Sequence, residues 1–189
     1  MRAFIAIALP PEIKRYLAKV QEKLAAGNAD VKWVEPDNIH LTLKFLGEID
    51  EPAREKIRST ISDIARSVAP FSVRLASCGA FPRIESARVI WMGVGQGERE
   101  LQSIAGLIEE RMSQLGIARE DRPFSSHITL GRTRSGKNLK GLAALLKDLC
   151  ERQPDKIYEF QADRITLFKS TLTPRGPRYE IIHEACFTL

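Results

Sequence analysis

The sequence of 189 residues predicts an α+β protein that forms one duplicated, bilobal domain. Several short segments alternate between apolar and polar side chains, as half-buried β-strands do. Longer segments repeat apolar residues every three or four positions, as amphipathic helices do. A four-residue pattern also occurs twice, because His40-Leu41-Thr42-Leu43 recurs as His127-Ile128-Thr129-Leu130, 87 residues later. We therefore expect two related lobes, with a boundary near residues 95–98 and with the helices on the outside.

The helices and strands alternate along the chain and have recognisable ends. Pro11 and Pro52 stand where helices begin, a position in which the missing N–H costs nothing, and Gly116 ends the third helical pattern. Helices are predicted over residues 11–26, 52–67, 98–115 and 138–151. Strands are predicted over residues 2–9, 38–47, 71–80, 87–94, 126–132, 157–169 and 178–187, the last two joined around residues 174–177.

The repeated motif places one imidazole and one hydroxyl on the same face of each strand. Alternate side chains of a strand share a face, so His40 and Thr42 point one way while the leucines between and after them point into the core. His127 and Thr129 behave in the same way. If a pseudo-twofold axis relates the lobes, the two faces meet across a cleft.

Two imidazoles flanked by two hydroxyls suit the hydrolysis of a phosphoester. A neutral histidine removes a proton from water, and a protonated one gives a proton to the leaving oxygen. The unperturbed histidine pKa of about 6.5 allows both forms near neutral pH. The threonine hydroxyls can donate hydrogen bonds to the non-bridging phosphate oxygens. This chemistry requires no metal ion and no cofactor, and the three dispersed cysteines offer no metal-binding pair.

Composition limits the class of protein and its partners. The chain has 29 Lys and Arg against 24 Asp and Glu, and this net charge of +5 permits a polyanionic partner. No apolar run approaches the roughly 18 residues of a membrane span, and the short apolar start before Pro10 indicates a first strand rather than a signal peptide. Three unpaired cysteines, expected to be reduced and mostly buried, favour a cytoplasmic location.

Five segments, which include the two motifs and reach beyond them, carry a resemblance to a known family. They are Phe4–Pro10, Trp33–Glu48, Gly79–Pro82, Arg88–Trp91 and His127–Arg132. Together they resemble the 2H phosphoesterase superfamily and, within it, the bacterial and archaeal RNA 2′,3′-cyclic phosphodiesterases, also called 2′-5′ RNA ligases. The resemblance covers essentially the whole chain.

The resemblance implies a fold, a reaction and a substrate. The fold is a single domain over residues 1–189, with two antiparallel sheets around a water-filled cleft. The reaction opens RNA 2′,3′-cyclic phosphate ends to 2′-phosphates, with reversible 2′-5′ ligation as a related activity. His40 is then the proton donor and His127 the proton acceptor, an order that the residues alone leave open. RNA ends, tRNA fragments among them, are the expected partner, and the protein is expected to be a monomer that binds no membrane.

Three further residues are considered for the site or its surroundings, and a fourth position departs from the family pattern. Arg132 could bind phosphate oxygens, although strict alternation turns it away from His127 unless the strand ends or bulges. Phe4 either packs in the core or lines the cleft, and His183 is expected to be structural. Some members of the family carry an acidic residue where this chain has Ala8, which receives no role.

Two other functions remain open. An RNA-binding module could hold cyclic-phosphate ends without turnover, although binding alone does not need an acid and base pair. The span from Gly131 to Asn138 reads GxxxxGK, but Asn138 replaces the Ser or Thr that holds Mg²⁺ in a P-loop. We therefore expect residues 132–140 to be a basic loop, which either binds RNA phosphates or is simply solvated.

Overall fold

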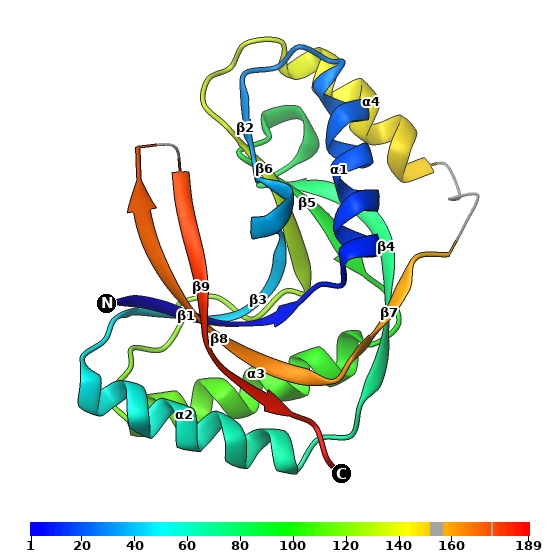
Figure 1. Cartoon of the computed structure of the whole chain (residues 1–189). Coiled ribbons are helices and arrows are strands. Elements are labelled where there is room, and N and C mark those ends of the chain that lie inside the picture. The colour runs from blue at the N-terminus through cyan, green and yellow to red at the C-terminus, as the bar shows by residue number, and fades with distance from the viewer. Residues whose placement is uncertain (152–156, 175) are drawn as a thin grey trace.

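The computed structural model describes residues 1–151, 157–174 and 176–189, and its strands form one curled antiparallel sheet (Figure 1). The helices are α1 (Pro11–Ala25), α2 (Glu51–Arg66), α3 (Glu98–Gln114) and α4 (Leu139–Glu151), with short 3-10 helices η1 (Pro36–Asn38) and η2 (Ile84–Ser86). The strands are β1 (Arg2–Ala8), β2 (Val31–Trp33), β3 (His40–Glu48), β4 (Phe71–Phe81), β5 (Val89–Val94), β6 (His127–Thr133), β7 (Glu159–Ala162), β8 (Arg164–Thr173) and β9 (Gly176–Cys186).

The predicted helices are confirmed to within one or two residues at each end, and most strands likewise. Two strand predictions needed correction. The segment 157–169 divides at Asp163, because β7 pairs with β4 whereas β8 pairs with β1 and β9. The short strand β2 was not predicted, and it pairs with β6. Arg175, in the predicted connection at residues 174–177, lies outside the described residues.

The two expected sheets are joined into one. The strand order is β7-β4-β5-β6-β3-β1-β8-β9, with β2 beside β6. The two motif strands, β6 and β3, make the junction through the pair Leu41 and Ile128, each completely buried. The sheet therefore bends where the two motifs meet. The prediction of two separate sheets was wrong in this respect, because the chain pattern gives no sign that the motif strands touch.

Each lobe contains strands from both halves of the sequence. The first half runs β1-α1-β3-α2-β4, and the second runs β5-α3-β6-α4-β8. In each half the first strand pairs with the motif strand, β1 with β3 and β5 with β6. The last strand of each half pairs with the first strand of the other half. Strand β4 of the first half pairs with β5, and β8 of the second half pairs with β1. By this strand pairing the second repeat begins with β5, a few residues before the expected boundary near residues 95–98.

The helices lie on the outside, as predicted. In Figure 1, α1 and α4 cover the lobe built on β4, β5 and β6, while α2 and α3 cover the other lobe. Helix α1 shows the usual reason, since its buried residues recur with helical spacing and face the sheet: Ile13, Leu17, Val20 and Leu24. Helix α2 begins at Asp50, whose carboxylate accepts the Ala53 N–H at 2.9 Å and so caps the first turn.

The three cysteines are free thiols. Cys78 is buried, Cys150 is half-buried and Cys186 is exposed, so the expectation that most of them are buried holds only in part. Within the described ranges, no helix has the length and apolar character needed to cross a membrane.

Candidate active site

The two motif strands bring the predicted side chains together at the junction of the lobes. Because Leu41 pairs with Ile128 in an antiparallel register, His40 stands opposite Thr129 and Thr42 stands opposite His127. The motif histidines and threonines are all half-buried, whereas the apolar residues between them are buried in the core. The motif histidines and threonines therefore project from the face of the strands opposite to the buried Leu41 and Ile128.

Both imidazoles are held by the same backbone contact. Nδ1 of His40 lies 2.7 Å from the Asn38 carbonyl oxygen, and Nδ1 of His127 lies 2.8 Å from that of Ser125. A carbonyl can only accept, so Nδ1 carries the hydrogen in each ring. Nε2 is then left to exchange a proton with a ligand. The contact to the residue two positions earlier thus recurs in both motifs, although the first follows the 3-10 helix η1 and the second follows a loop.

His40 lies against a group of aromatic rings. Its ring centre is 4.7 Å from that of Phe4 and 5.3 Å from that of Tyr179, with Phe168 slightly farther away. Burial lowers the pKa of His40 to about 4; the Asn38 hydrogen bond opposes this and the charge of Lys14 adds to it. His40 is therefore neutral in the free protein near pH 7. This differs from the expectation of an unperturbed imidazole, because the sequence did not show which rings would surround it.

His127 and both threonines line an open cavity of about 410 Å³. Phe81 forms an edge-to-face contact with His127, with ring centres 5.2 Å apart. The wall of the cavity continues through the aromatic rings of Phe45 and Phe124. Apolar ring faces thus stand beside the polar groups of the motifs.

A bulge in each motif strand turns one further residue toward the cleft. In β6, Thr129 pairs with Trp91 and Gly131 with Ile90, so Leu130 is an extra residue and the alternation shifts. Arg132 is consequently exposed and lines the cavity beside His127. Strict alternation placed it on the opposite face unless the strand bulges, and the bulge is present.

The equivalent bulge in β3 explains a residue that the sequence analysis missed. Thr42 pairs with Ala6 and Lys44 with Ile5, so Leu43 is extra, and Phe45 is turned outward with 58% of its surface exposed. The sequence shows only an aromatic residue three positions after the motif threonine. Alternation alone assigns Phe45 to the core side.

Lys44 connects the first motif to the loop that carries the second. Its side chain is completely buried, and its Nζ donates to Glu109 at 2.7 Å and to the Ala118 carbonyl at 3.0 Å. Glu109 also accepts the Glu120 N–H at 2.9 Å. Residues 118–120 are thereby fixed to β3 and α3, a few residues before His127.

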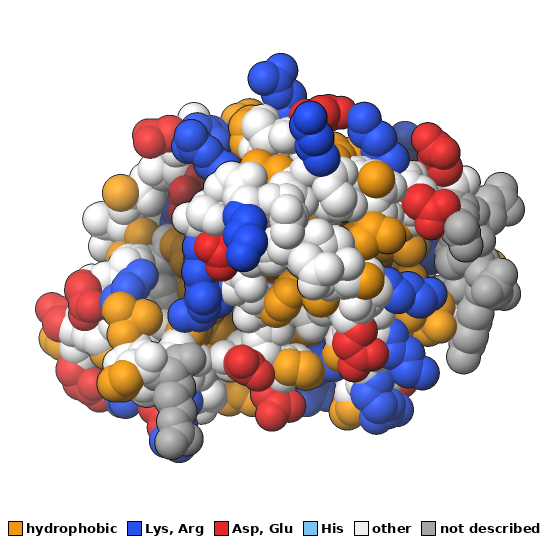
Figure 2. Space-filling model, turned by 90° about the horizontal axis from the view of Figure 1, so that it is seen from above, with side chains coloured by type: hydrophobic (Ala, Val, Ile, Leu, Met, Phe, Trp, Pro, Cys, Tyr) orange, Lys and Arg blue, Asp and Glu red, His pale blue; other side chains and the backbone are white. Residues whose placement is uncertain are grey.

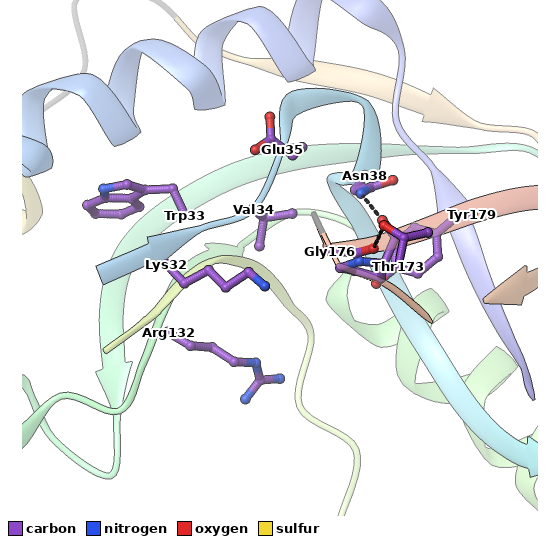
Figure 3. Close-up of a pocket in the computed structure, with 10 residues that line it drawn as sticks. Lys32, Trp33, Val34, Glu35, Asn38, Arg132, Thr173, Gly176 and Tyr179 are labelled. Carbon is purple, nitrogen blue, oxygen red and sulfur yellow. Dashed lines mark hydrogen bonds between the residues drawn. The ribbon is translucent and has the colours of Figure 1, made fainter. Parts of the chain in front are cut away.

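A second cavity, of about 470 Å³, lies on the other side of Arg132 (Figure 3). It is bounded by β2, η1 and the hairpin of β8 and β9, and Tyr179 brings its wall next to His40. The Asn38 side chain donates to the Pro177 carbonyl at 2.8 Å and so ties the hairpin to η1. The two cavities thus meet at Arg132. His127 lines one of them, and His40 packs against Tyr179 in the wall of the other.

The remaining candidates fall outside the site. Phe4 is a core residue, 3% exposed, although its ring supports His40. His183 is structural, as predicted, because its Nε2 lies 2.9 Å from the Ser62 hydroxyl. The GxxxxGK span precedes α4, and the side-chain amide of Asn138 donates to the Asn28 carbonyl at 2.9 Å. Across the described residues, no group of three His, Cys, Asp or Glu side chains is placed to hold a metal ion.

Comparison with known proteins agrees with this geometry. The sequence pattern of the family described as "LigT like Phosphoesterase" matches the chain twice, over residues 7–91 and 93–179. An RNA 2′,3′-cyclic phosphodiesterase of Methanocaldococcus jannaschii is 41% identical over 185 residues, covering 97% of this chain and 99% of the relative. The same name is given to a relative from Thermotoga maritima, 34% identical over 99% of this chain and 96% of its own.

Two solved structures share the fold. The crystal structure of the protein TT0787 of Thermus thermophilus superposes with a TM-score of 0.81, at 28% identity, over 99% of this chain and 98% of its own. Escherichia coli LigT, crystallised with 3′-AMP, gives a TM-score of 0.74 at 27% identity, over 100% and 98%. Each of the two matches of the family pattern contains one of the two motifs. The chain belongs to the family of LigT-like 2H phosphoesterases.

Proposed function

We propose that this protein is an RNA 2′,3′-cyclic phosphodiesterase that leaves a 2′-phosphate. The observation that carries the proposal is the pairing of β3 with β6 at Leu41 and Ile128, because it brings the two His-Thr motifs together. His127, Thr42 and Thr129 line one cavity there. Full-length relatives that carry this activity in their names support it. Both motifs belong to one chain, so a single copy holds the complete set and a monomer suffices.

The reaction is a single displacement at phosphorus. His127 Nε2 takes a proton from water, the water oxygen bonds to phosphorus, and the bond from phosphorus to the ribose O3′ breaks. His40 Nε2–H gives its proton to O3′, so a free 3′-hydroxyl and a 2′-phosphomonoester result. Thr42 and Thr129 donate to the non-bridging oxygens, and Arg132 adds a charge-assisted contact. The two imidazoles supply the acid and the base without a metal ion or a cofactor.

The low pKa of His40 is compatible with a proton donor. A cyclic phosphate brings a negative charge next to the ring, and an opposite charge favours the imidazolium. His40 then takes up its proton when substrate binds and is a strong acid toward O3′. The donor role for His40 and the acceptor role for His127 come from the family resemblance, and this balance of burial and substrate charge is compatible with them.

The aromatic wall gives the terminal nucleoside a place to bind. Phe45, Phe81 and Phe124 line the cavity that contains His127. An exposed ring of this kind stacks on any base, because every base has a π face. We infer that the terminal base lies on Phe45, while its cyclic phosphate reaches the histidines.

The same displacement can run with a different nucleophile. A 5′-hydroxyl of a second RNA in place of water gives a 2′-5′ linkage, with the same proton transfers at His127 and His40. Reversible ligation is thus a further activity that the proposed mechanism allows.

The deciding experiment is incubation of a short RNA that ends in a 2′,3′-cyclic phosphate in H₂¹⁸O. We expect turnover to a 2′-phosphate carrying one ¹⁸O, identified by mass spectrometry and ³¹P NMR. A 3′-phosphate product would contradict the assigned leaving group. Tight binding with no turnover would instead identify a module that holds RNA ends.

A further inference from the structure

Two positive charges stand directly opposite each other at the edge of the cleft. In the β2–β6 pair, Lys32 is the register partner of Arg132, so both side chains leave the same face. Neighbours of this kind have Cβ atoms about 5 Å apart, and like charges so placed destabilise a sheet. In the described part of the chain, neither cation forms an ion pair with a carboxylate. An anion between them would remove this repulsion.

Both cations border the 470 Å³ cavity between β2 and the β8–β9 hairpin. Figure 3 shows the Lys32 amine and the Arg132 guanidinium reaching into this space, opposite Tyr179 and Gly176. Val34 and Pro177 add apolar wall. Seen from above, Lys and Arg side chains line a furrow on the left of the molecule (Figure 2). A charged rim around a partly apolar cavity of this volume matches the two parts of a nucleotide, its phosphate and its base.

The cavity directly adjoins the catalytic pair. Tyr179 contacts the His40 ring at 5.3 Å between ring centres, and Arg132 borders both cavities. Burial raises the pKa of Tyr179, so its hydroxyl remains a neutral hydrogen-bond donor. The terminal nucleoside, by the proposed function, lies on the Phe45 side. The cavity at Lys32 is therefore the adjacent space into which the rest of an RNA chain can extend.

Resting on the proposed function, we propose that Lys32 binds the phosphodiester that joins the terminal nucleoside to the rest of the RNA. Arg132 borders both cavities, so its guanidinium lies between this phosphodiester and the cyclic phosphate that it contacts. The preceding nucleoside then occupies the cavity lined by Val34, Pro177 and Tyr179. The protein consequently recognises two successive nucleotides, and it prefers a dinucleotide with a 2′,3′-cyclic phosphate to a mononucleotide with the same end.

The experiment compares kcat/KM for the two substrates in the wild type and in two variants, Lys32→Ala and Lys32→Glu. Lys32 is exposed, so both variants are expected to fold. We expect the dinucleotide to lose roughly 10- to 100-fold in Lys32→Ala, and more in Lys32→Glu, with the mononucleotide unchanged. Lys56→Ala, an exposed lysine on α2, is the matched control and leaves both values unaltered.

A change in the substrate tests the same contact without altering the protein. A dinucleotide whose internal linkage is a neutral methylphosphonate should lose its advantage in the wild type and show no further loss in Lys32→Ala. Equal rates for mononucleotide and dinucleotide in the wild type would overturn the inference, as would equal losses on both substrates in Lys32→Ala. In both cases the wild type still hydrolyses the mononucleotide, whereas failure of the proposed function abolishes that hydrolysis.

Discussion

Phe45 and Arg132 occupy equivalent positions in the two motif strands, three residues after each motif threonine and just beyond a bulge. One is an exposed phenyl ring and the other a guanidinium. The duplicated scaffold is therefore symmetric in its backbone and in its histidines, but not in what flanks them. In the proposed function this asymmetry orients the substrate, with its base on the Phe45 side and its phosphate on the Arg132 side.

Replacing Phe45 should weaken substrate binding and leave the chemistry intact. Loss of a stacking ring costs about 1–3 kcal/mol per base, so Phe45→Ala should raise KM roughly 5- to 100-fold with kcat nearly unchanged. Phe45→Tyr keeps a ring and should behave like the wild type. Ile181→Ala removes another exposed apolar side chain, 57% exposed on β9, and serves as the control. A fall in kcat at constant KM would assign Phe45 a different role.

The two histidines should act as one unit. His40→Ala and His127→Ala should each lower the single-turnover rate by about 10²–10⁴-fold, the usual contribution of a proton-transfer residue. The double variant should be only modestly slower than the worse single variant, because removing either partner already disables the displacement. His183→Ala is the matched control and should retain activity. Near-normal turnover in either single variant would disprove the two-imidazole mechanism.

The lowered pKa of His40 predicts a pH-dependent stability. Between about pH 6.5 and 4 the unfolded chain protonates this ring at its ordinary pKa, while the folded protein keeps it neutral. The unfolded state then binds more protons, so the free energy of unfolding should fall as the pH is lowered through this range. Urea unfolding of His40→Gln, which cannot titrate, should show a shallower dependence. Identical slopes for the two proteins would mean that His40 titrates normally.

The ion pair between Lys44 and Glu109 should stabilise the folded protein. Glu109→Gln leaves the buried Lys44 ammonium without a carboxylate, and we expect a loss of about 2–3 kcal/mol in the free energy of unfolding. This is less than the 3–5 kcal/mol typical of a fully buried pair, because about a quarter of the Glu109 side chain is exposed. Glu110→Gln, one residue along and exposed, is the control and should change little. A cost confined to activity, with normal urea unfolding, would contradict a structural role.

Turnover should survive a chelator. The proposed acid and base are both imidazoles, so the proton transfers themselves involve no metal. Initial rates in excess EDTA should equal those in untreated protein, after prolonged dialysis as well. Loss of activity that a single divalent cation restores would refute this prediction.

Local signals predicted much of the site. Apolar periodicity predicts the helices and the two motif strands. Strand alternation predicts that each motif histidine shares a face with the threonine two residues later. The motif strands meet at Leu41 and Ile128, and β4 and β8 each pair with a strand of the other repeat. These are long-range pairings that periodicity does not encode. Arg132 and Phe45 depend on bulges, where one extra residue reverses the expected face. The low pKa of His40 depends on rings from three other strand segments, which only the folded chain brings together.

The exchange of β4 and β8 between the repeats makes the molecule mechanically stiff. A pair of lobes joined by a single linker can swing apart as rigid bodies, whereas here each lobe holds a strand that belongs to the other repeat. Separating the two repeats would break the backbone hydrogen bonds of the β4–β5 pair and of the β8–β1 pair at once. The spacing of the two imidazoles is therefore set when the chain folds, and substrates of different size must be accommodated by the loops and side chains at the rim.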